Sequence, residues 1–201
     1  MAKIKQIEEC RSCGNKELTT VFDIGDLKIN AFVEEPNLDV GSAPLALVHC
    51  NECDLVQLTH TVREEDLYKN YWYLSRLNKK IVDNLESITV DASYEVELHD
   101  NDIVVDIGAN DGTLLSFYPD NVTRVGIDPA QNIHSELKDN CDIMIGDFFN
   151  QKNWEEKMGK QKAKIVTTVA MFYDLDNPNS FVQDIKRILD ESGVWVCQLM
   201  T

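Results

Sequence analysis

One stretch of the chain pairs an apolar run with an acid and two glycines at fixed spacing. Ile103 to Val105 predict a buried central strand of a parallel sheet, and Asp106 follows this run. Gly108 and Gly112 then mark a tight turn, at which the backbone can approach a ligand closely. The order D-x-G-x-x-x-G lacks the G-x-G-x-x-G spacing of dinucleotide sites. This stretch therefore predicts a loop that binds a cofactor of another class.

A helix is expected directly after this loop. It should begin at Thr113 and end before Pro119, and its free N–H groups would face the ligand. A second acid, Asp128, ends the next apolar stretch and lies 22 residues after Asp106. An acid at about 20 residues is where a ribose diol is bound in nucleotide sites. The alternative is a turn of an unrelated doubly wound domain, in which two acids and two glycines coincide by accident.

Two C-x-x-C pairs, Cys10 with Cys13 and Cys50 with Cys53, could supply four thiolates. Four thiolates are a ligand set that tetrahedral Zn²⁺ prefers in structural sites. The alternatives are a redox pair or buried free cysteines. Redox pairs usually act singly at a helix start in a thioredoxin-like βαβ unit, and that pattern is absent from this sequence. We therefore expect one structural zinc bound by all four cysteines.

The remaining cysteines and the histidines are expected to lie outside these sites. Cys141 and Cys197 fall in strand-like runs and are interpreted as core residues. No histidine is expected at a strand end that faces the cofactor, and all four are interpreted as surface residues: His49, His60, His99 and His134. The sequence thus offers no catalytic base.

Alternating apolar runs and helical patterns predict the elements that position these residues. The expected strands of a Rossmann-like parallel sheet are residues 103–106, 122–128, 142–145, 164–169 and 194–200. Pro178 should begin the last helix and Gly193 should end it. The carboxyl end of the fourth strand should meet that of the first, where ligands bind in such sheets. The fold class is α/β.

We expect three parts in the chain. Residues 1–60 predict a small β-rich zinc-binding module, with short strands at 21–25, 30–33, 45–50 and 55–58. Residues 61–90 predict a helical bridge or lid, because Thr61 to Glu64 form a capping-box pattern. Residues 91–201 predict the Rossmann-like, cofactor-binding domain.

Composition limits the partners. The chain has 201 residues with 35 acids against 19 bases, so its formal charge of −16 disfavours nucleic acids and anionic membranes. The first residues lack the apolar core of a signal peptide, and no run of about 18 apolar residues occurs. We therefore expect a cytoplasmic protein with reduced cysteines.

The loop from Asp106 to Gly112 resembles motif I of class I S-adenosylmethionine (SAM) methyltransferases, in which the acid faces the amino-acid end of the cofactor. Asp147 could then accept from the adenine amino group, and Phe148 could stack on the ring or belong to the core. An aromatic cluster near Tyr71 either packs as core or covers the cofactor. The predicted cofactor residues are Asp106, Gly108, Ala109, Asn110, Gly112, Asp128, Pro129, Asp147, Phe148, Met171, Tyr71 and Tyr73.

A wider combination of segments resembles the zinc-containing, SAM-dependent sugar C-methyltransferases. The segments are both cysteine pairs, Asn30 to Phe32, Leu47 to Leu58, Tyr71-x-Tyr73-x-Ser75 with Asn78, Asp106 to Leu115, and Met171 to Leu175. The resemblance implies a zinc domain, a SAM domain, and a nucleotide-linked 4-keto-6-deoxysugar as substrate. Arg76 stands where this family usually has glycine.

The resemblance also implies a segment after the fifth strand that carries the base, and the chain ends at Thr201 before it. We therefore expect this chain to bind SAM but to turn over little or no sugar. Two alternatives stay open at this point, an O- or N-methyltransferase on another small molecule and a non-catalytic zinc-ribbon binding module. The oligomeric state is not predicted.

Overall fold

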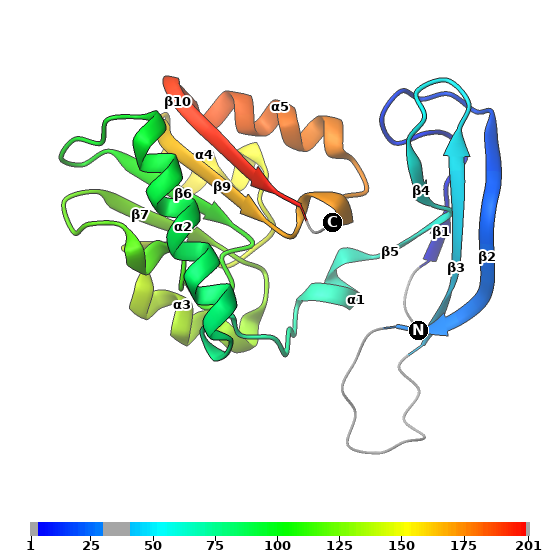
Figure 1. The fold of residues 1–201 in the computed structure, drawn as a ribbon, viewed down its shortest axis with the longest axis horizontal. Helices are drawn as coiled ribbons and strands as arrows, with labels where there is room; N and C mark the ends of the chain where they lie inside the picture. The colour runs from blue at the N-terminus through cyan, green and yellow to red at the C-terminus, as the bar shows by residue number, and fades with distance from the viewer. Residues whose placement is uncertain (1–3, 30–40, 200–201) are drawn as a thin grey trace. The chain divides into compact units, whose positions relative to one another are not determined.

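The computed structural model describes residues 4–29 and 41–199 and divides into two compact units (Figure 1). The first unit runs to Trp72 and includes Asp176–Asn179, and the second holds Tyr73–Leu175 and the residues from Ser180 onward. The strand expected at Asn30 to Val33 lies outside the described residues. Within the described ranges, no helix is both long and apolar enough to cross a membrane.

The described residues of the first unit form two small antiparallel sheets and the short helix that follows them. Strands β2 (Leu18–Lys28), β3 (Ser42–Cys50) and β4 (Val56–Leu58) form one sheet in this order, and β1 (Ile4–Gln6) pairs with β5 (His60–Val62). Successive side chains of a strand point to opposite faces, and the most buried residues of β3 alternate accordingly: Ala46, Val48 and Cys50. The sheet thus places the second cysteine pair at the end of its central strand.

The capping box expected at Thr61 is wrong. Thr61 lies in β5 and pairs with Lys5, and its Oγ1 accepts from Arg11 Nη2 at 2.7 Å. The hydroxyl that would have capped a helix therefore binds Arg11 instead. A short helix α1 (Glu64–Tyr68) begins two residues later than expected, after Arg63 and without a side-chain cap.

The second unit is a five-stranded parallel sheet with the order β10-β9-β6-β7-β8. Its strands are β6 (Ile103–Ile107), β7 (Thr123–Ile127), β8 (Ile143–Ile145), β9 (Ala163–Val169) and β10 (Leu189–Gln198). Every residue of β6 is buried, as expected for the central strand of a parallel sheet. The α/β, Rossmann-like fold class is therefore confirmed.

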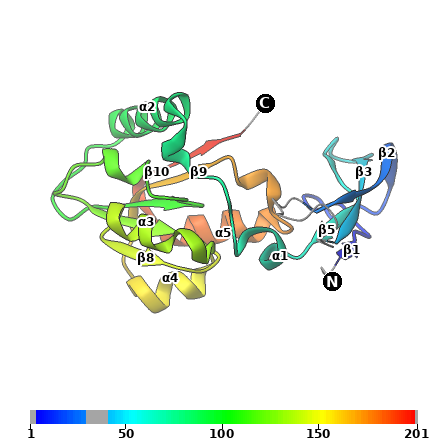
Figure 2. The same cartoon turned by 90° about the horizontal axis from the view of Figure 1, so that it is seen from below.

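Helices cover both faces of this sheet (Figure 2). On one face, α4 (Gln151–Met158) and α5 (Pro178–Ile188) pack against alternate residues of β6, beginning with Ile103. On the other face, Val104 packs with α2 (Lys79–Glu95) and with Leu137 of α3 (His134–Asn140). Four 3₁₀ turns complete the unit: η1 (Ser75–Leu77), η2 (Leu115–Phe117), η3 (Gln131–Ile133) and η4 (Phe172–Asp174).

The helix expected from Thr113 is reduced to the 3₁₀ turn η2. The side chain of Thr113 donates to Asp111 at 2.6 Å, a local bond that competes with helix formation. Tyr118 is already extended, as the residue before a proline prefers to be. The loop after β6 is therefore followed by a 3₁₀ turn and not by an α-helix.

Gly193 does not end α5, which already stops at Ile188. It lies in β10, between the pairs Leu189 with Ala163 and Val194 with Ile165, where the register shifts. A Cβ at position 193 would lie 2.9 Å from the carbonyl oxygens of Ala163 and Lys164. The glycine is thus required by the close approach of β9 and not by a helix end.

The expectation for Cys197 is also wrong. Among the described strands β10 lies at the edge of the sheet, and Cys197 on it is exposed, whereas Cys141 is only partly buried. The apolar runs around both cysteines predict core positions. Such a run does not show which face of an edge strand is covered, so it cannot distinguish a buried cysteine from an exposed one.

We predict that Gly193→Ala destabilises the second unit by about 1–3 kcal/mol, because two backbone oxygens of β9 must move to admit the methyl group. Urea unfolding followed by tryptophan fluorescence measures the change. Glu191→Ala, an exposed change in the same strand, is the control and should stay within about 0.5 kcal/mol of the wild type. Equal midpoints for both variants would contradict the steric account.

Candidate functional site

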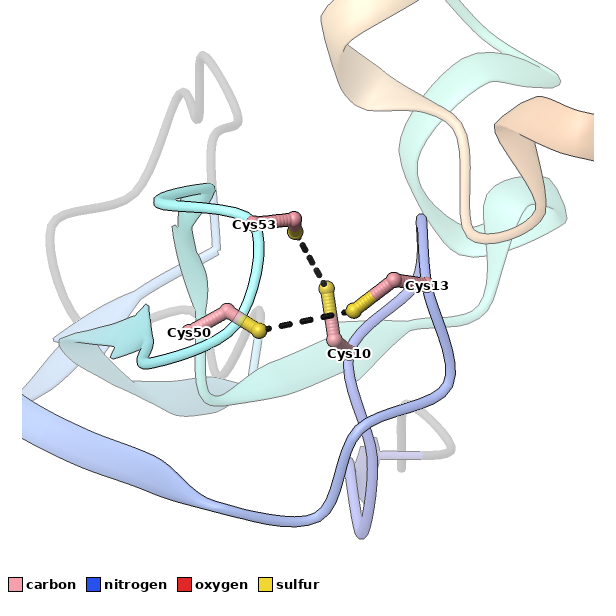
Figure 3. Close-up of side chains that lie close together, drawn as sticks. All are labelled: Cys10, Cys13, Cys50 and Cys53. Atoms are coloured by element: carbon pink, nitrogen blue, oxygen red, sulfur yellow. Dashed lines mark hydrogen bonds between the residues drawn. The ribbon is translucent and has the colours of Figure 1, made fainter.

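The four predicted zinc ligands lie together in the first unit (Figure 3). The Sγ atoms of Cys10 and Cys53 are 3.6 Å apart, those of Cys13 and Cys50 are 3.5 Å apart, and all four lie within 4.8 Å of one another. A tetrahedral zinc with bonds of about 2.3 Å requires sulfurs roughly 3.8 Å apart. All four cysteines are free thiols. The cluster therefore fits one tetrahedral zinc ion.

The two cysteine pairs sit on turns of the same construction. Gly14 N donates to Cys10 O at 2.9 Å, and Asp54 N donates to Cys50 O at 3.0 Å. Both donors have a left-handed backbone, with φ of 75° for Gly14 and 61° for Asp54. Asp is among the few residues other than glycine that adopt this conformation readily. The aspartate in the second pair is therefore compatible with the turn that the first pair makes with glycine.

Backbone N–H groups inside these turns favour the thiolate form. Burial raises the pKa of the Cys10 thiol, but hydrogen bonds led by those of the Cys13 and Ser12 backbone lower it to about 6. The backbone of Cys53 lowers the pKa of Cys50 in the same way, against the effect of burial. Thiolates are the species that bind a metal, so the turns prepare the site for it. His49 lies outside the ligand set and contacts Asp54 with Nε2 at 3.1 Å.

In the second unit, most backbone N–H groups of the loop after β6 are hydrogen-bonded within the unit. The N–H groups of five loop residues donate inside the unit: Gly108, Ala109, Asn110, Gly112 and Thr113. The first two share Ile127 O, and Asn110 N reaches Asp128 Oδ2 at 2.8 Å. A pyrophosphate site needs such groups free to bind oxygen anions. The loop is therefore poorly suited to a dinucleotide.

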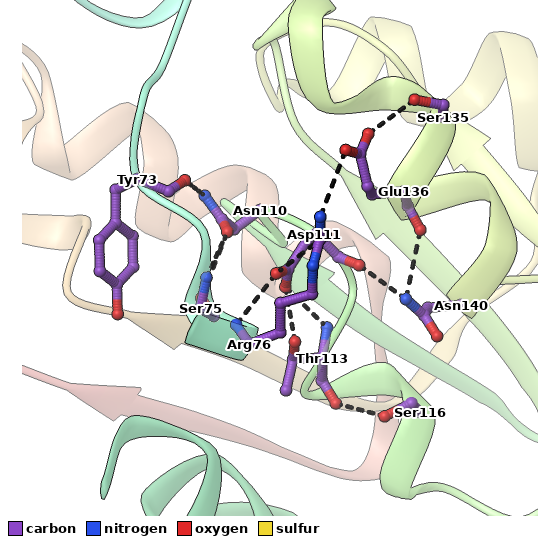
Figure 4. A network of polar contacts seen from close by, with 10 residues as sticks. All are labelled: Tyr73, Ser75, Arg76, Asn110, Asp111, Thr113, Ser116, Ser135, Glu136 and Asn140. Atoms are coloured by element: carbon purple, nitrogen blue, oxygen red, sulfur yellow. Dashed lines mark hydrogen bonds and ion pairs between the residues drawn. The ribbon is translucent and has the colours of Figure 1, made fainter. Parts of the chain in front are cut away.

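The side chain of Asn110 fastens the segment 73–76 to this loop (Figure 4). Its Nδ2 donates to Tyr73 O at 2.9 Å, and its Oδ1 accepts from Ser75 N at 3.0 Å and from Ser75 Oγ at 3.3 Å. Arg76 N donates in turn to Asp111 Oδ2 at 3.0 Å. Asn110 has φ of 52°, a left-handed value that asparagine tolerates. We call these contacts the 73–76 clamp.

Asp111 is fully buried, and its polar atoms contact other residues of the unit. Its Oδ1 accepts from the backbone and hydroxyl of Thr113, and its carbonyl accepts from Asn140 Nδ2 at 2.8 Å. The guanidinium of Arg76 lies 3.6 Å from Asp111 Oδ2 and 3.5 Å from Glu136 Oε1. Arg76 therefore supplies positive charge to a buried carboxylate.

Asp106 lies at the end of β6 and is 4% exposed. Its Oδ1 is 2.7 Å from Thr167 Oγ1 on the neighbouring strand β9, and the same hydroxyl lies 3.1 Å from Val105 O. Burial raises the pKa of the Asp106 carboxyl to about 7, with the Thr167 bond opposing and the nearby Asp128 adding to the rise. A neutral Asp106 can donate to Thr167, which then donates to Val105 O, so the neutral form satisfies all three groups.

Asp128 ends β7 and accepts one backbone N–H on each carboxylate oxygen, from Asn110 and from Ala130, both at 2.8 Å. Burial raises the pKa of Asp128, and these two bonds and the nearby His134 lower it in part. Each oxygen keeps a lone pair for a further donor.

The interpretation of His134 as a surface residue is wrong. It is half-buried, and its Nε2 donates to Asp128 O at 3.1 Å, at the strand end where the cofactor residues meet. A Cβ at Gly146, just after β8, would lie 2.7 Å from the His134 ring. No sequence pattern indicates this position, because the first residue of α3 comes close to the strand ends only in the folded chain.

The other predicted cofactor residues of this unit also lie at the carboxyl ends of strands. Asp147 after β8 is exposed, Phe148 is half-buried, and Asp147 Oδ1 accepts from Phe148 N at 2.8 Å. Met171 follows β9, and a Cβ added to Gly108 would lie 3.3 Å from its Cγ. Ala170 before it has φ of 54°, a left-handed value that is strained for alanine.

The two tyrosines predicted to bind the cofactor, Tyr71 and Tyr73, belong to different units. Tyr73 belongs to the second unit and binds the loop through its carbonyl oxygen. Burial raises the pKa of its hydroxyl, Ser75 lowers it and the charge of Asp111 adds to the rise. Tyr71 belongs to the first unit, with its ring centroid 6.2 Å from that of Tyr68. Tyr71 is therefore absent from the site that the second unit forms by itself.

Sequence reasoning missed four residues that shape the site: Ser75, Asp111, His134 and Thr167. Polar side chains within or beside apolar runs were the available signal for Asp111 and Thr167. Arg76, which binds Asp111, is 35 residues away along the chain and Asp106, which binds Thr167, is 61 residues away, so spacing alone could not pair them.

We predict one zinc ion per chain, measured by elemental analysis of protein purified without chelators. Cys50→Ser should abolish binding, because a structural zinc contributes on the order of 10 kcal/mol to a small module and needs all four ligands. Cys197→Ser, an exposed cysteine outside the cluster, should keep one ion per chain. Loss of metal in both variants, or in neither, would contradict the assignment.

We also predict that Asp106→Asn stabilises the protein above pH 7. The folded pKa of Asp106 is raised to about 7, so its favourable contribution is complete below the unfolded pKa of about 3.9 and is lost as pH rises to 7. Asparagine imitates the neutral acid, so the difference between variant and wild type should reach a few kcal/mol by pH 8 and vanish near pH 4. Urea midpoints measured across this range provide the test.

Asp142→Asn is the control of opposite sign, since the hydrogen bond from Arg124 lowers the pKa of Asp142. That variant should lose stability at neutral pH and approach the wild type in acid. A pH-independent effect at position 106 would refute a neutral Asp106.

The known proteins to which parts of this chain are similar are methyltransferases. Residues 10–68 match a methyltransferase family model described as “Putative zinc binding domain”. C-methyltransferase NovU of Streptomyces niveus is 28% identical over 201 residues, which cover 98% of this chain and 48% of that protein. The chain thus spans about half the length of this curated relative.

Solved methyltransferase structures also superpose on parts of this chain, with TM-scores below 0.5. A SAM-dependent methyltransferase of Clostridium acetobutylicum superposes with a TM-score of 0.46 at 15% identity, covering 58% of this chain and 49% of that one. Precorrin-6y C5,15-methyltransferase of Geobacter metallireducens gives a TM-score of 0.45 at 14% identity, covering 67% and 69%. The chain is similar to a C-methyltransferase along almost its whole length, and residues 10–68 match a zinc-binding domain described for a methyltransferase family.

Proposed function

We propose that the second unit binds SAM at the carboxyl ends of β6 to β9. The observation that carries this proposal is the loop after β6, whose N–H groups donate internally while the strand ends beside it carry Asp106 and Asp128. The N–H donors of this site are already hydrogen-bonded and its acids are buried, so the site disfavours a pyrophosphate. It favours a ligand with positive charge and hydroxyl donors, and the sulfonium, ammonium and ribose groups of SAM provide both.

We assign the residues by their donors and acceptors. The free lone pairs of Asp128 would accept from the ribose diol, and Asp147 would accept from the adenine amino group while Phe148 stacks on the ring. Gly108, Ala109 and Met171 would line the path to the sulfur, with Gly108 leaving room beside Met171. Pro129 and Gly112 shape the chain, and Asn110 acts through the 73–76 clamp.

We propose C-methylation as the reaction of the whole protein, on a nucleotide-linked 4-keto-6-deoxysugar. The support is the similarity to C-methyltransferase NovU and the family resemblance of the sequence. Bound SAM supplies a methyl group on a positive sulfur, already activated for transfer. A ketone acidifies the neighbouring C–H, a base takes that proton, and the carbon forms the new bond to methyl as the S–CH₃ bond breaks. The residues of this chain hold and orient the donor, and we assign no base among them.

The zinc module serves a structural role in this proposal. Its four cysteines fill the tetrahedral coordination of the ion, so no position remains for a substrate or an activated water. Methyl transfer would therefore depend on the metal only through the fold of the first unit.

The first test is calorimetry with SAM, S-adenosylhomocysteine and NAD. The wild-type chain should bind the first two and not the third, and Asp128→Ala should weaken SAM by a few kcal/mol, because a charged acceptor of the diol is lost. Asp120→Asn, with a side chain 98% exposed, is the control. Binding of NAD without SAM would overturn the cofactor assignment.

A methyl-transfer assay with the full-length protein tests the reaction. Isotope-labelled SAM should place its methyl group on a carbon of a 4-keto-6-deoxy nucleotide sugar, as nuclear magnetic resonance of the product can determine. A methyl group found on oxygen or nitrogen would replace the C-methylation proposal by an O- or N-methyltransferase.

A further inference from the structure

The ring of His134 lies against the ends of two neighbouring strands. Its Nε2 donates to Asp128 O at 3.1 Å, just after β7. A Cβ added to Gly146, just after β8, would lie 2.7 Å from Cε1 of the ring and 3.3 Å from both ring nitrogens. Asp128 N donates to Ile145 O at 3.1 Å, the last bond between these strands. The ring therefore lies where the pairing of β7 with β8 ends.

This ring explains why residue 146 is a glycine. Gly146 does not have a left-handed backbone, so its conformation is open to alanine. The three heavy atoms nearest to an added Cβ all belong to His134, and the shortest distance is far below the 3.5–4.0 Å or so of an ordinary contact. The imidazole is rigid and is held at Nε2, so it can yield only by weakening its bond to Asp128.

The two acids beside this ring are those assigned above to the two ends of adenosine. Asp128 would accept from the ribose diol, and Asp147, directly after Gly146, would accept from the adenine amino group. Gly146 and Asp147 are exposed and His134 is half-buried, so a ligand can reach them. Phe148 N donates to Asp147 Oδ1 at 2.8 Å and fixes this carboxylate on its own backbone. The separation of the two acids is therefore set by backbone positions that both lie against His134.

We propose that His134 is a positioning residue of the adenosine site, whose ring holds Asp128 and Asp147 at the separation that ribose and adenine require. This inference rests on the proposed binding of SAM and deepens it. Two acceptors that bind one rigid nucleoside must be held to within about 0.5 Å, because a hydrogen bond weakens beyond about 3.2 Å. A rigid ring that is bonded to one strand end and packed against the other meets this requirement.

A double-mutant cycle in the full chain, with S-adenosylhomocysteine in the calorimeter, tests this role. Gly146→Ala should weaken binding about tenfold, because the methyl group displaces the ring. His134→Ala should weaken binding by a similar factor. When His134→Ala is already present, Gly146→Ala should change the affinity less than about twofold, because nothing is left to displace. His99→Ala, which removes an exposed histidine of the same unit, is the control and should bind as the wild type does.

Selectivity for the base separates positioning from a general loss of structure. The wild type should prefer S-adenosylhomocysteine to its inosine analogue by about 10–100-fold, because the analogue carries an oxygen in place of the amino group that Asp147 would bind. His134→Ala should reduce this preference several-fold, since Asp147 is no longer held. A chain that is only destabilised would lose affinity for both ligands by the same factor.

The outcomes distinguish this inference from the function on which it rests. If His134→Ala does not fold in urea titrations, His134→Gln takes its place, because it keeps an N–H donor for Asp128 O and lacks the ring. If Gly146→Ala does not fold, the selectivity for the base decides alone. Additive losses in the cycle, or an unchanged preference for adenosine in the His134 variants, would overturn the inference and leave SAM binding intact. A wild-type chain that binds neither SAM nor S-adenosylhomocysteine would overturn the proposed function and this inference with it.

Discussion

Carboxylates that accept backbone N–H groups are the interaction on which the second unit depends. A chain that leaves a buried strand in a sharp left-handed turn cannot pair its amides within a helix, and each buried amide left unpaired would cost about 1–3 kcal/mol. Asp128 accepts from the backbone N–H groups of Asn110 and Ala130. Asp111 accepts from those of Thr113 and Arg76. Asp111 in this loop and Asp128 after β7 therefore build the shape of the site before they meet any ligand.

The first unit depends on metal coordination for its stability. Its sheets are small, and much of β2 is exposed, including Val21, Phe22 and Ile24. So few buried side chains supply little stabilisation for a module of this size. Four sulfurs brought within 4.8 Å of one another provide the missing connection when they share one ion. The two units are thus held by different physical means, one by a layered apolar core and the other by coordination.

The fold was largely predictable because its strongest signals are local. The β-branched run at Ile103 to Val105 and the paired cysteines have fixed meanings at fixed spacing, and the structure confirmed the sheet and the cluster. The errors fall where a distant partner decides. Thr61 belongs to a strand because β1 pairs with it, and Gly193 is needed by the carbonyls of β9. His134 reaches the strand ends only because α3 begins beside Gly146.

The 73–76 clamp has a consequence for the motions of the second unit. Ser75 N and Arg76 N donate to side chains of the loop after β6, 35 residues further along the chain. Their amide hydrogens can therefore exchange with solvent only when that loop releases them, so segment and loop open as one cooperative unit. The exchange rate of two amides that precede α2 would then report how often the loop after β6 opens, and a ligand that rests on the loop would slow exchange at positions it does not touch.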